Sequence, residues 1–93
     1  MRKIRIADIR EFLERPVNVR RMLEAADRGR PPVEPLQHDL LDEFGQGVKQ
    51  DWVKMRIGRE TKYIMERNGY RHAEYSIPVT GPVFTVASVY VKA

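Results

Sequence analysis

The pattern of apolar and polar residues changes once along the chain, from a helical period to a strand period. Over the first half, apolar residues recur at intervals of three and four, as on one face of an α-helix. The first helix is predicted to begin at Asp8, which forms an Asp-x-x-Glu capping pattern with Glu11. It ends near Glu14, because Pro16 cannot continue it. Its buried face is formed by Ile9, Phe12 and Leu13. The alternating residues 3–6 predict a short edge strand.

Two further helices follow, each bounded by residues that favour helix ends. The second is predicted to begin at Asn18, a good N-cap residue, and to end at Gly29, which suits a left-handed position after the helix. The third begins around Pro35 and ends at Gly45. The buried faces of the two helices are formed by Val19, Met22, Leu23 and Ala26, and by Leu36, Leu40, Leu41 and Phe44.

Residues 46–69 pose the choice that decides the predicted fold. One helical face carries three apolar residues and then three charged ones: Val48, Trp52 and Met55, followed by Arg59, Lys62 and Glu66. The apolar Ile57 and Ile64 lie almost opposite, at about 100° per residue. A straight helix would have to bury opposed faces in turn, and Gly58 costs a helix about 1 kcal/mol relative to alanine. We therefore predict two helices, at about 47–55 and 58–68, with Trp52 packed in the core.

After Asn68-Gly69 the apolar period becomes two, which predicts strands at 70–77 and 83–91 joined as a hairpin. Helices followed by a terminal hairpin predict an α+β fold of the winged helix-turn-helix type, with extra N-terminal helices. We expect one domain over residues 1–93, in which a helical extension of residues 1–33 packs on a winged-helix core of residues 34–93.

A family resemblance supports this interpretation. Ile57-Gly58-Arg59-x-x-Lys62-x-x-Met65, followed by Gly69-Tyr70 and by Tyr90, resembles the winged helix-turn-helix module at the C-terminal end of many viral and plasmid primase-helicases. The resemblance covers about a third of the chain, and residues 1–33 have no counterpart in it. It implies the fold and a contact with nucleic acid. These 93 residues hold no ATPase or primase domain, so it implies no enzymatic activity.

Composition narrows the class of protein. The chain is 42% hydrophobic and 32% charged and has no cysteine, which is typical of a globular cytoplasmic protein and excludes disulfides and thiolate metal sites. No apolar run approaches the roughly 20 residues of a membrane span. The net charge of +4 is compatible with a nucleic-acid partner. Residues 31–47 carry four acidic and no basic side chains, between two basic zones.

The candidate site is the charged face of the predicted last helix. We expect double-stranded DNA as the partner of a homodimeric protein that regulates transcription or belongs to a mobile element. Bases or backbone would be met by Arg59, Lys62 and Tyr63, and phosphates would be held by Arg56, Arg67, Arg71 and His72. The alternative for this face is an ordinary surface pair between Lys62 and Glu66 at i,i+4.

The predicted hairpin favours a second hypothesis, a protein-interaction module such as an adaptor or inhibitor. Between Glu74 and Val91 there is no lysine or arginine to meet a phosphate. An apolar tip would instead contact a protein or a second copy through Val79, Val83 and Phe84. The acidic third helix would add to that surface. His38 and His72 lack the spacing of a metal site, and no nucleophile constellation is present, so we expect no metal, no cofactor and no catalysis.

Overall fold

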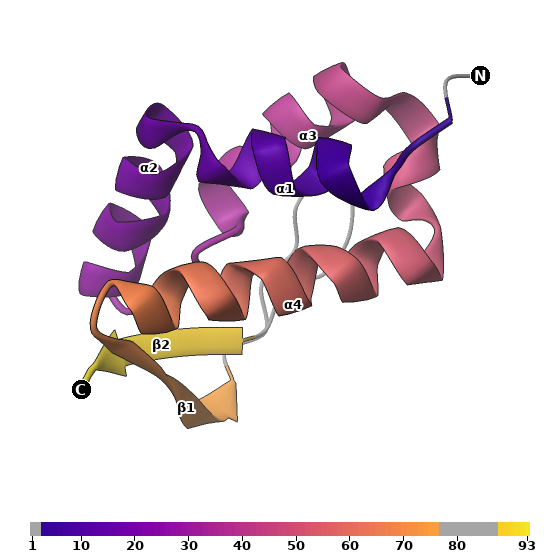
Figure 1. Cartoon of the computed structure of the whole chain (residues 1–93). Helices are drawn as coiled ribbons and strands as arrows, with labels where there is room; N and C mark the ends of the chain where they lie inside the picture. The colour runs from indigo at the N-terminus through magenta and orange to yellow at the C-terminus, as the bar shows by residue number, and fades with distance from the viewer. Residues whose placement is uncertain (1–2, 77–87) are drawn as a thin grey trace.

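The computed structural model describes residues 3–76 and 88–93 of the chain, and within them the fold is α+β (Figure 1). Four helices and two short 3₁₀ turns precede a two-stranded antiparallel sheet. In chain order these are α1 (Ile6–Glu14), α2 (Pro16–Asp27), η1 (Glu34–Leu36), α3 (Gln37–Phe44), η2 (Gly45–Lys49), α4 (Asp51–Arg67), β1 (Tyr70–Ser76) and β2 (Ser88–Lys92). The predicted order of helices and then strands is confirmed at this level.

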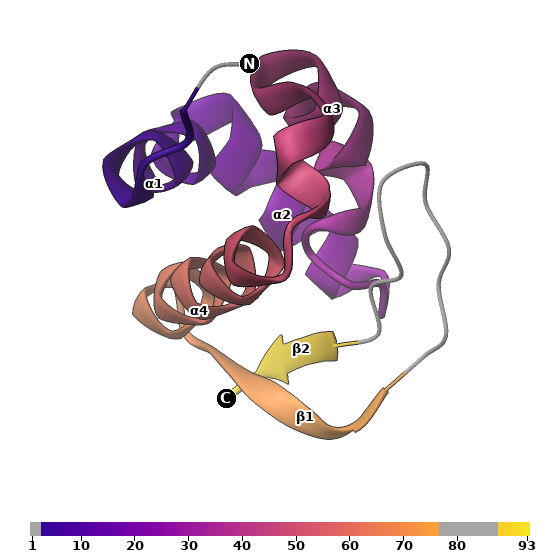
Figure 2. The same ribbon diagram turned by 90° about the vertical axis from the view of Figure 1, so that its right-hand side faces the viewer.

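The long helix α4 occupies the middle of the molecule, with α1 on one side and the hairpin on the other (Figures 1 and 2). α2 packs against η1 and β2, and η2 leads from α3 into α4. One buried cluster joins all these elements, and its members come from residues 1–33 as well as from residues 34–93. The division into an extension and a winged-helix core stays a prediction.

The first two helices begin earlier than predicted. α1 begins at Ile6, and its N-cap is Arg5, whose backbone N–H donates to the Asp8 carboxylate at 3.2 Å. Asp8 is thus the third residue of the helix rather than its cap, and the edge strand expected at residues 3–6 is not formed. α2 begins at Pro16, because proline is well suited to the first turn of a helix.

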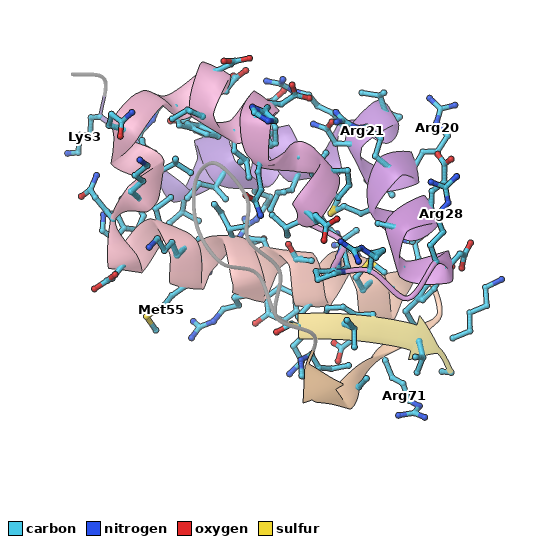
Figure 3. The ribbon with its side chains drawn as sticks, turned by 180° about the vertical axis from the view of Figure 1, so that it is seen from behind. Lys3, Arg20, Arg21, Arg28, Met55 and Arg71 are labelled. Atoms are coloured by element: carbon cyan, nitrogen blue, oxygen red, sulfur yellow. The ribbon has the colours of Figure 1, made fainter. Side chains whose placement is uncertain are left out.

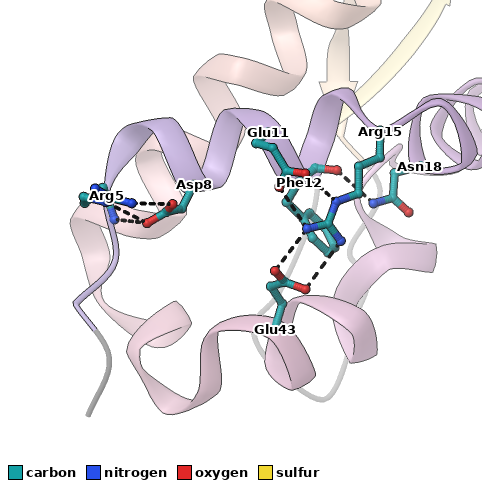
Figure 4. Close-up of polar contacts among 7 residues, drawn as sticks. All are labelled: Arg5, Asp8, Glu11, Phe12, Arg15, Asn18 and Glu43. Carbon is teal, nitrogen blue, oxygen red and sulfur yellow. Dashed lines mark hydrogen bonds and ion pairs between the residues drawn. The ribbon is translucent and has the colours of Figure 1, made fainter.

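Asn18 is therefore not an N-cap, and its side chain has a different task. It is buried, and its Nδ2 donates to the carbonyl of Phe12 at 2.9 Å, which ties the last turn of α1 to the start of α2 (Figure 4). The ends of α2 and α3 follow the prediction. Gly29 and Gly45 both have positive φ, at 73° and 65°, a conformation that favours glycine.

The predicted break near Gly58 is wrong, since α4 is one helix from Asp51 to Arg67. Its buried face is continuous and is formed by Val53, Ile57, Glu60, Thr61, Ile64 and Met65. The conflict between two opposed faces disappears because Trp52 and Met55 are not core residues, being 43% and 70% exposed. Val48, which is fully buried, lies in η2, and the extended Gln50 separates it from the helix (ψ 140°).

The hairpin places β1 beside β2 in the register Tyr70↔Lys92, Arg71↔Val91, His72↔Tyr90 and Ser76↔Ser88, with an irregularity between His72 and Ser76. The predicted interface residues Val79, Val83 and Phe84 lie outside the described residues. None of the helices described is long and apolar enough to cross a membrane.

Candidate nucleic-acid interface

The unbroken α4 gathers three of the seven predicted contact residues, Arg59, Lys62 and Tyr63, on a single outer face. At about 100° per residue, the residues exposed along this face follow one another over the length of the helix. They are Trp52, Met55, Arg59, Lys62, Tyr63 and Glu66. The opposite face is buried against the rest of the protein. Although the predicted break is wrong, Arg59 and Lys62 are exposed as expected, on one long helix and not on the second of two.

An open groove of about 450 Å³ lies between this face and the hairpin. It brings together four of the seven residues predicted from the sequence, namely Arg59, Lys62, Tyr63 and His72. It is completed by Gly58, Ser88 and Tyr90, and none of its described lining residues is acidic. A Cβ added at Gly58 would meet nothing within 4 Å, so the backbone of α4 is open to the groove at this residue.

On the hairpin side, an aromatic pair lines the groove. His72 and Tyr90 are cross-strand partners, and their rings meet edge to face with centroids 5.2 Å apart. Tyr90 is buried, and that burial, with a smaller contribution from the charge of Glu66, raises the pKa of its hydroxyl to about 12. The hydroxyl is therefore neutral at physiological pH. Ser88 and Tyr90 were missed by the sequence-based prediction, because only the strand register places them opposite α4.

Arg56, although predicted to hold phosphate, is engaged within the protein. Its Nη1 donates to Glu60 at 3.1 Å, and Arg10 of α1 donates to the same carboxylate at 3.0 Å and 3.3 Å. Glu60 is only 4% exposed. The hydrogen bond from Arg10 lowers the pKa of Glu60, and the hydrogen bond from Arg56 and the charges of both arginines add to that effect against the cost of burial. The carboxylate thus occupies both guanidinium groups.

Arg67 and Arg71, which were also predicted to hold phosphates, are not among the residues that line the groove. Arg67 donates to Glu14 of α1 at 3.3 Å, although both side chains are well exposed. Arg71 is exposed and projects from the hairpin away from α4 (Figure 3), so it lies apart from the groove. The structure therefore separates the seven predicted residues into a group of four at the groove and three outside it.

The two central cations, Arg59 and Lys62, have no acidic partner among the side chains of residues 3–73 and 88–93. The predicted alternative, a surface pair between Lys62 and Glu66, is not formed, and Arg59 makes no ion pair there either. Both side chains are exposed. A phosphate approaching this face would therefore not have to displace an intramolecular carboxylate.

The acidic zone of residues 31–47 is largely neutralised by arginines of the N-terminal half. Three ion pairs do this, and they join Arg30 to Glu34, Arg21 to Asp39 and Arg15 to Glu43. Figure 4 shows Arg15 between Glu11 and Glu43, with its guanidinium group over the ring of Phe12. On α3, Asp39 and Glu43 are thus paired with arginines, whereas Asp42 is exposed. The protein-interaction hypothesis stays a prediction.

A second, smaller hollow of about 210 Å³ lies at the N-terminal end of α4. It is lined by Ile6, Trp52, Met55, Arg56 and Arg59. The prediction missed it by placing Trp52 in the core. The signal was present in the sequence, since Trp52 and Met55 share a helical face with Arg59, Lys62 and Glu66, which cannot be buried together.

Comparisons with protein-family models, with curated proteins and with solved structures found no match. The winged-helix resemblance therefore stays a prediction based on the residues that carry it. Among the described residues, no group of three histidine, aspartate or glutamate side chains lies close enough to hold a metal ion.

Proposed function

We propose that this protein binds double-stranded DNA through the outer face of α4 and the groove beside it. The observation that carries the proposal is the pair Arg59 and Lys62, exposed and without an acidic partner in the described part of the chain, on the same groove as Tyr63 and His72. Lysine and tyrosine bind phosphate oxygens, and arginine can also bind guanine through two hydrogen bonds. A cationic groove with no acidic residue in its described lining suits a polyanion.

The order of elements supports the same proposal. α3, the turn η2, α4 and then a hairpin follow one another as in a winged helix-turn-helix, with α4 as the helix that would enter the major groove. Its 17 residues span about 25 Å at 1.5 Å per residue, and a major groove about 12 Å wide admits an α-helix. A homodimer and a non-enzymatic regulatory role complete the proposal.

Neutralising the two central cations tests this function. The variant Arg59→Gln/Lys62→Gln should bind a duplex more weakly, and the slope of log K against log salt concentration should fall by about two. The measurement is fluorescence anisotropy of a labelled duplex at several salt concentrations.

A matched control removes the same charge from another surface. Arg20 and Arg28 are exposed on and just after α2, and the described residues give them no ion pair (Figure 3). Arg20→Gln/Arg28→Gln should leave the slope within about half a unit of the parent protein. Equal effects of the two double variants would show attraction by net charge alone, and an unchanged slope in Arg59→Gln/Lys62→Gln would refute the assignment.

A further inference from the structure

The hollow at the N-terminal end of α4 exposes large apolar side chains side by side. Trp52 and Met55 are 43% and 70% exposed, and Ile6 of α1 is 40% exposed. Figure 3 shows Met55 projecting from α4 into solvent. Single exposed apolar residues are ordinary, but a group of them around one hollow marks a binding surface. The indole of Trp52 is held along one edge, where its Nε1 donates to Oε1 of Gln50 at 3.2 Å.

The charges around the hollow narrow its occupant. Arg56 and Arg59 line it; Arg56 is paired with Glu60, so Arg59 is the cation that the lining offers to a ligand, and no acidic residue is among the described lining. Arg59 also lines the groove beside the hairpin, so one extended ligand would reach both sites. Trp52 and Arg59 are seven residues apart, which is about 10 Å along a helix, or about three nucleotides of a stacked strand at 3.4 Å each.

We infer that the hollow receives an unpaired nucleobase, stacked on Trp52, from the strand whose phosphates lie on Arg59 and Lys62. This rests on the proposed function and names its ligand class, a DNA duplex with a single-stranded overhang. Every base has a flat face that stacks on an aromatic ring, and such rings beside cations are typical of single-strand binding sites. One nucleic-acid strand supplies both the ring and the anion, whereas a protein partner would need an apolar residue and separate carboxylates.

Trp52 is the only tryptophan of the chain, so its fluorescence reports on this hollow alone. The probes are a blunt duplex and the same duplex extended by a short oligo-dT overhang. The overhang should quench the fluorescence and tighten binding by about tenfold, whereas the blunt duplex should bind without quenching. Trp52→Ala should abolish the tenfold preference, and Trp52→Phe, which keeps a ring, should retain most of it.

A control variant separates stacking from general loss of apolar surface. Val17 is exposed on α2 and does not line the hollow, so Val17→Ala should leave both affinities unchanged. Urea unfolding of each variant establishes that it is folded.

Two results would overturn the inference, and they are distinguishable. If both duplexes bind with a salt slope that depends on Arg59 and Lys62, but without quenching and without an effect of Trp52→Ala, the hollow holds no base and the proposed function survives. If neither duplex binds, the proposed function and the inference both fail.

Discussion

The arginines of the N-terminal helices and the cations on the outer face of α4 have the same chemistry but different surroundings. Around α1 and α2, five arginines are held by carboxylates: Arg5, Arg10, Arg15, Arg21 and Arg30. On α4, Arg59 and Lys62 are exposed and have no acidic partner among the side chains of residues 3–73 and 88–93. Both zones are basic in the sequence. Arg20 and Arg28 of the N-terminal zone are also exposed without an ion pair among the described residues, but they do not line the groove. The difference teaches that the density of charge does not mark a candidate binding surface, whereas unpaired cations that line a groove do.

The largest expected effect is on the free energy of unfolding and concerns Glu60 of α4, whose carboxylate pairs with Arg10 of α1 and with Arg56. Glu60→Gln would leave the guanidinium groups of Arg10 and Arg56 without their carboxylate in a mostly buried position. Removing one partner of a buried pair costs about 3–5 kcal/mol, and we expect about 2–3 kcal/mol here because Arg10 is half exposed. Urea unfolding measures this loss.

Glu66→Gln is the matched control for that variant. Glu66 is exposed on the same helix and makes no ion pair with the described residues. It should change the free energy of unfolding by less than about 0.5 kcal/mol. Similar losses from the two variants would mean that the buried pair contributes nothing particular to stability.

Acid should lower the free energy of unfolding through the Glu60 carboxylate. Hydrogen bonds and charge lower the pKa of Glu60 in the folded protein. A lowered pKa gives stability that is present above the unfolded value of about 4.3 and is lost as the pH falls through the folded value. Below pH ~4.3, the parent protein should therefore lose more stability than Glu60→Gln does, as measured by unfolding at a series of pH values. Parallel losses would exclude Glu60 as a source of the acid sensitivity.

Asn18 tests the junction of the two N-terminal helices. Asn18→Ala removes the side-chain hydrogen bond to the Phe12 carbonyl and leaves that buried carbonyl with one fewer donor. We expect the free energy of unfolding to fall by about 1–2 kcal/mol, measured by urea denaturation. If Asn18 acted only as a helix cap, Asn18→Ser would be as stable as the parent protein, because serine is also a good cap. The hydrogen bond to Phe12 needs the longer asparagine side chain, so we expect Asn18→Ser to be destabilised like Asn18→Ala.

A substitution at Gly58, on the face of α4 that carries Arg59 and Lys62, should raise the free energy of unfolding instead of lowering it. It lies within α4 and lines the groove, and an added Cβ would meet nothing within 4 Å. Gly58→Ala should raise the free energy of unfolding by about 1 kcal/mol through helix propensity. Because the methyl group enters the proposed binding groove, duplex affinity should fall at the same time. Thermal unfolding and anisotropy measure the two effects, and unchanged affinity would place the ligand elsewhere.

Local signals in the sequence predicted much of this fold. Pro16, Gly29 and Gly45 mark helix ends because their backbone constraints act within a few residues. The error at Gly58 had a different origin. It came from assuming that Trp52 must be buried, whereas burial depends on which elements cover a side chain in the tertiary structure.

The candidate site was predictable only in part, for the same reason. Helical spacing alone was sufficient to group Arg59, Lys62 and Tyr63. Helical spacing also offers the i,i+4 pair between Arg56 and Glu60. What the sequence could not show is the burial of Glu60 and its second partner, because Arg10 is 50 residues away and meets it only through the packing of α1 on α4. Tyr90 likewise joins the groove only through the strand register.

The most direct test of the comparison uses two neighbouring arginines of α4, one paired and one not. Arg59→Gln and Arg56→Gln are each titrated with a duplex over a range of salt concentrations, at a temperature where both are folded. The account predicts that Arg59→Gln lowers the slope of log K against log salt by about one, and Arg56→Gln by less than about half. Equal reductions, or the larger one in Arg56→Gln, would contradict it.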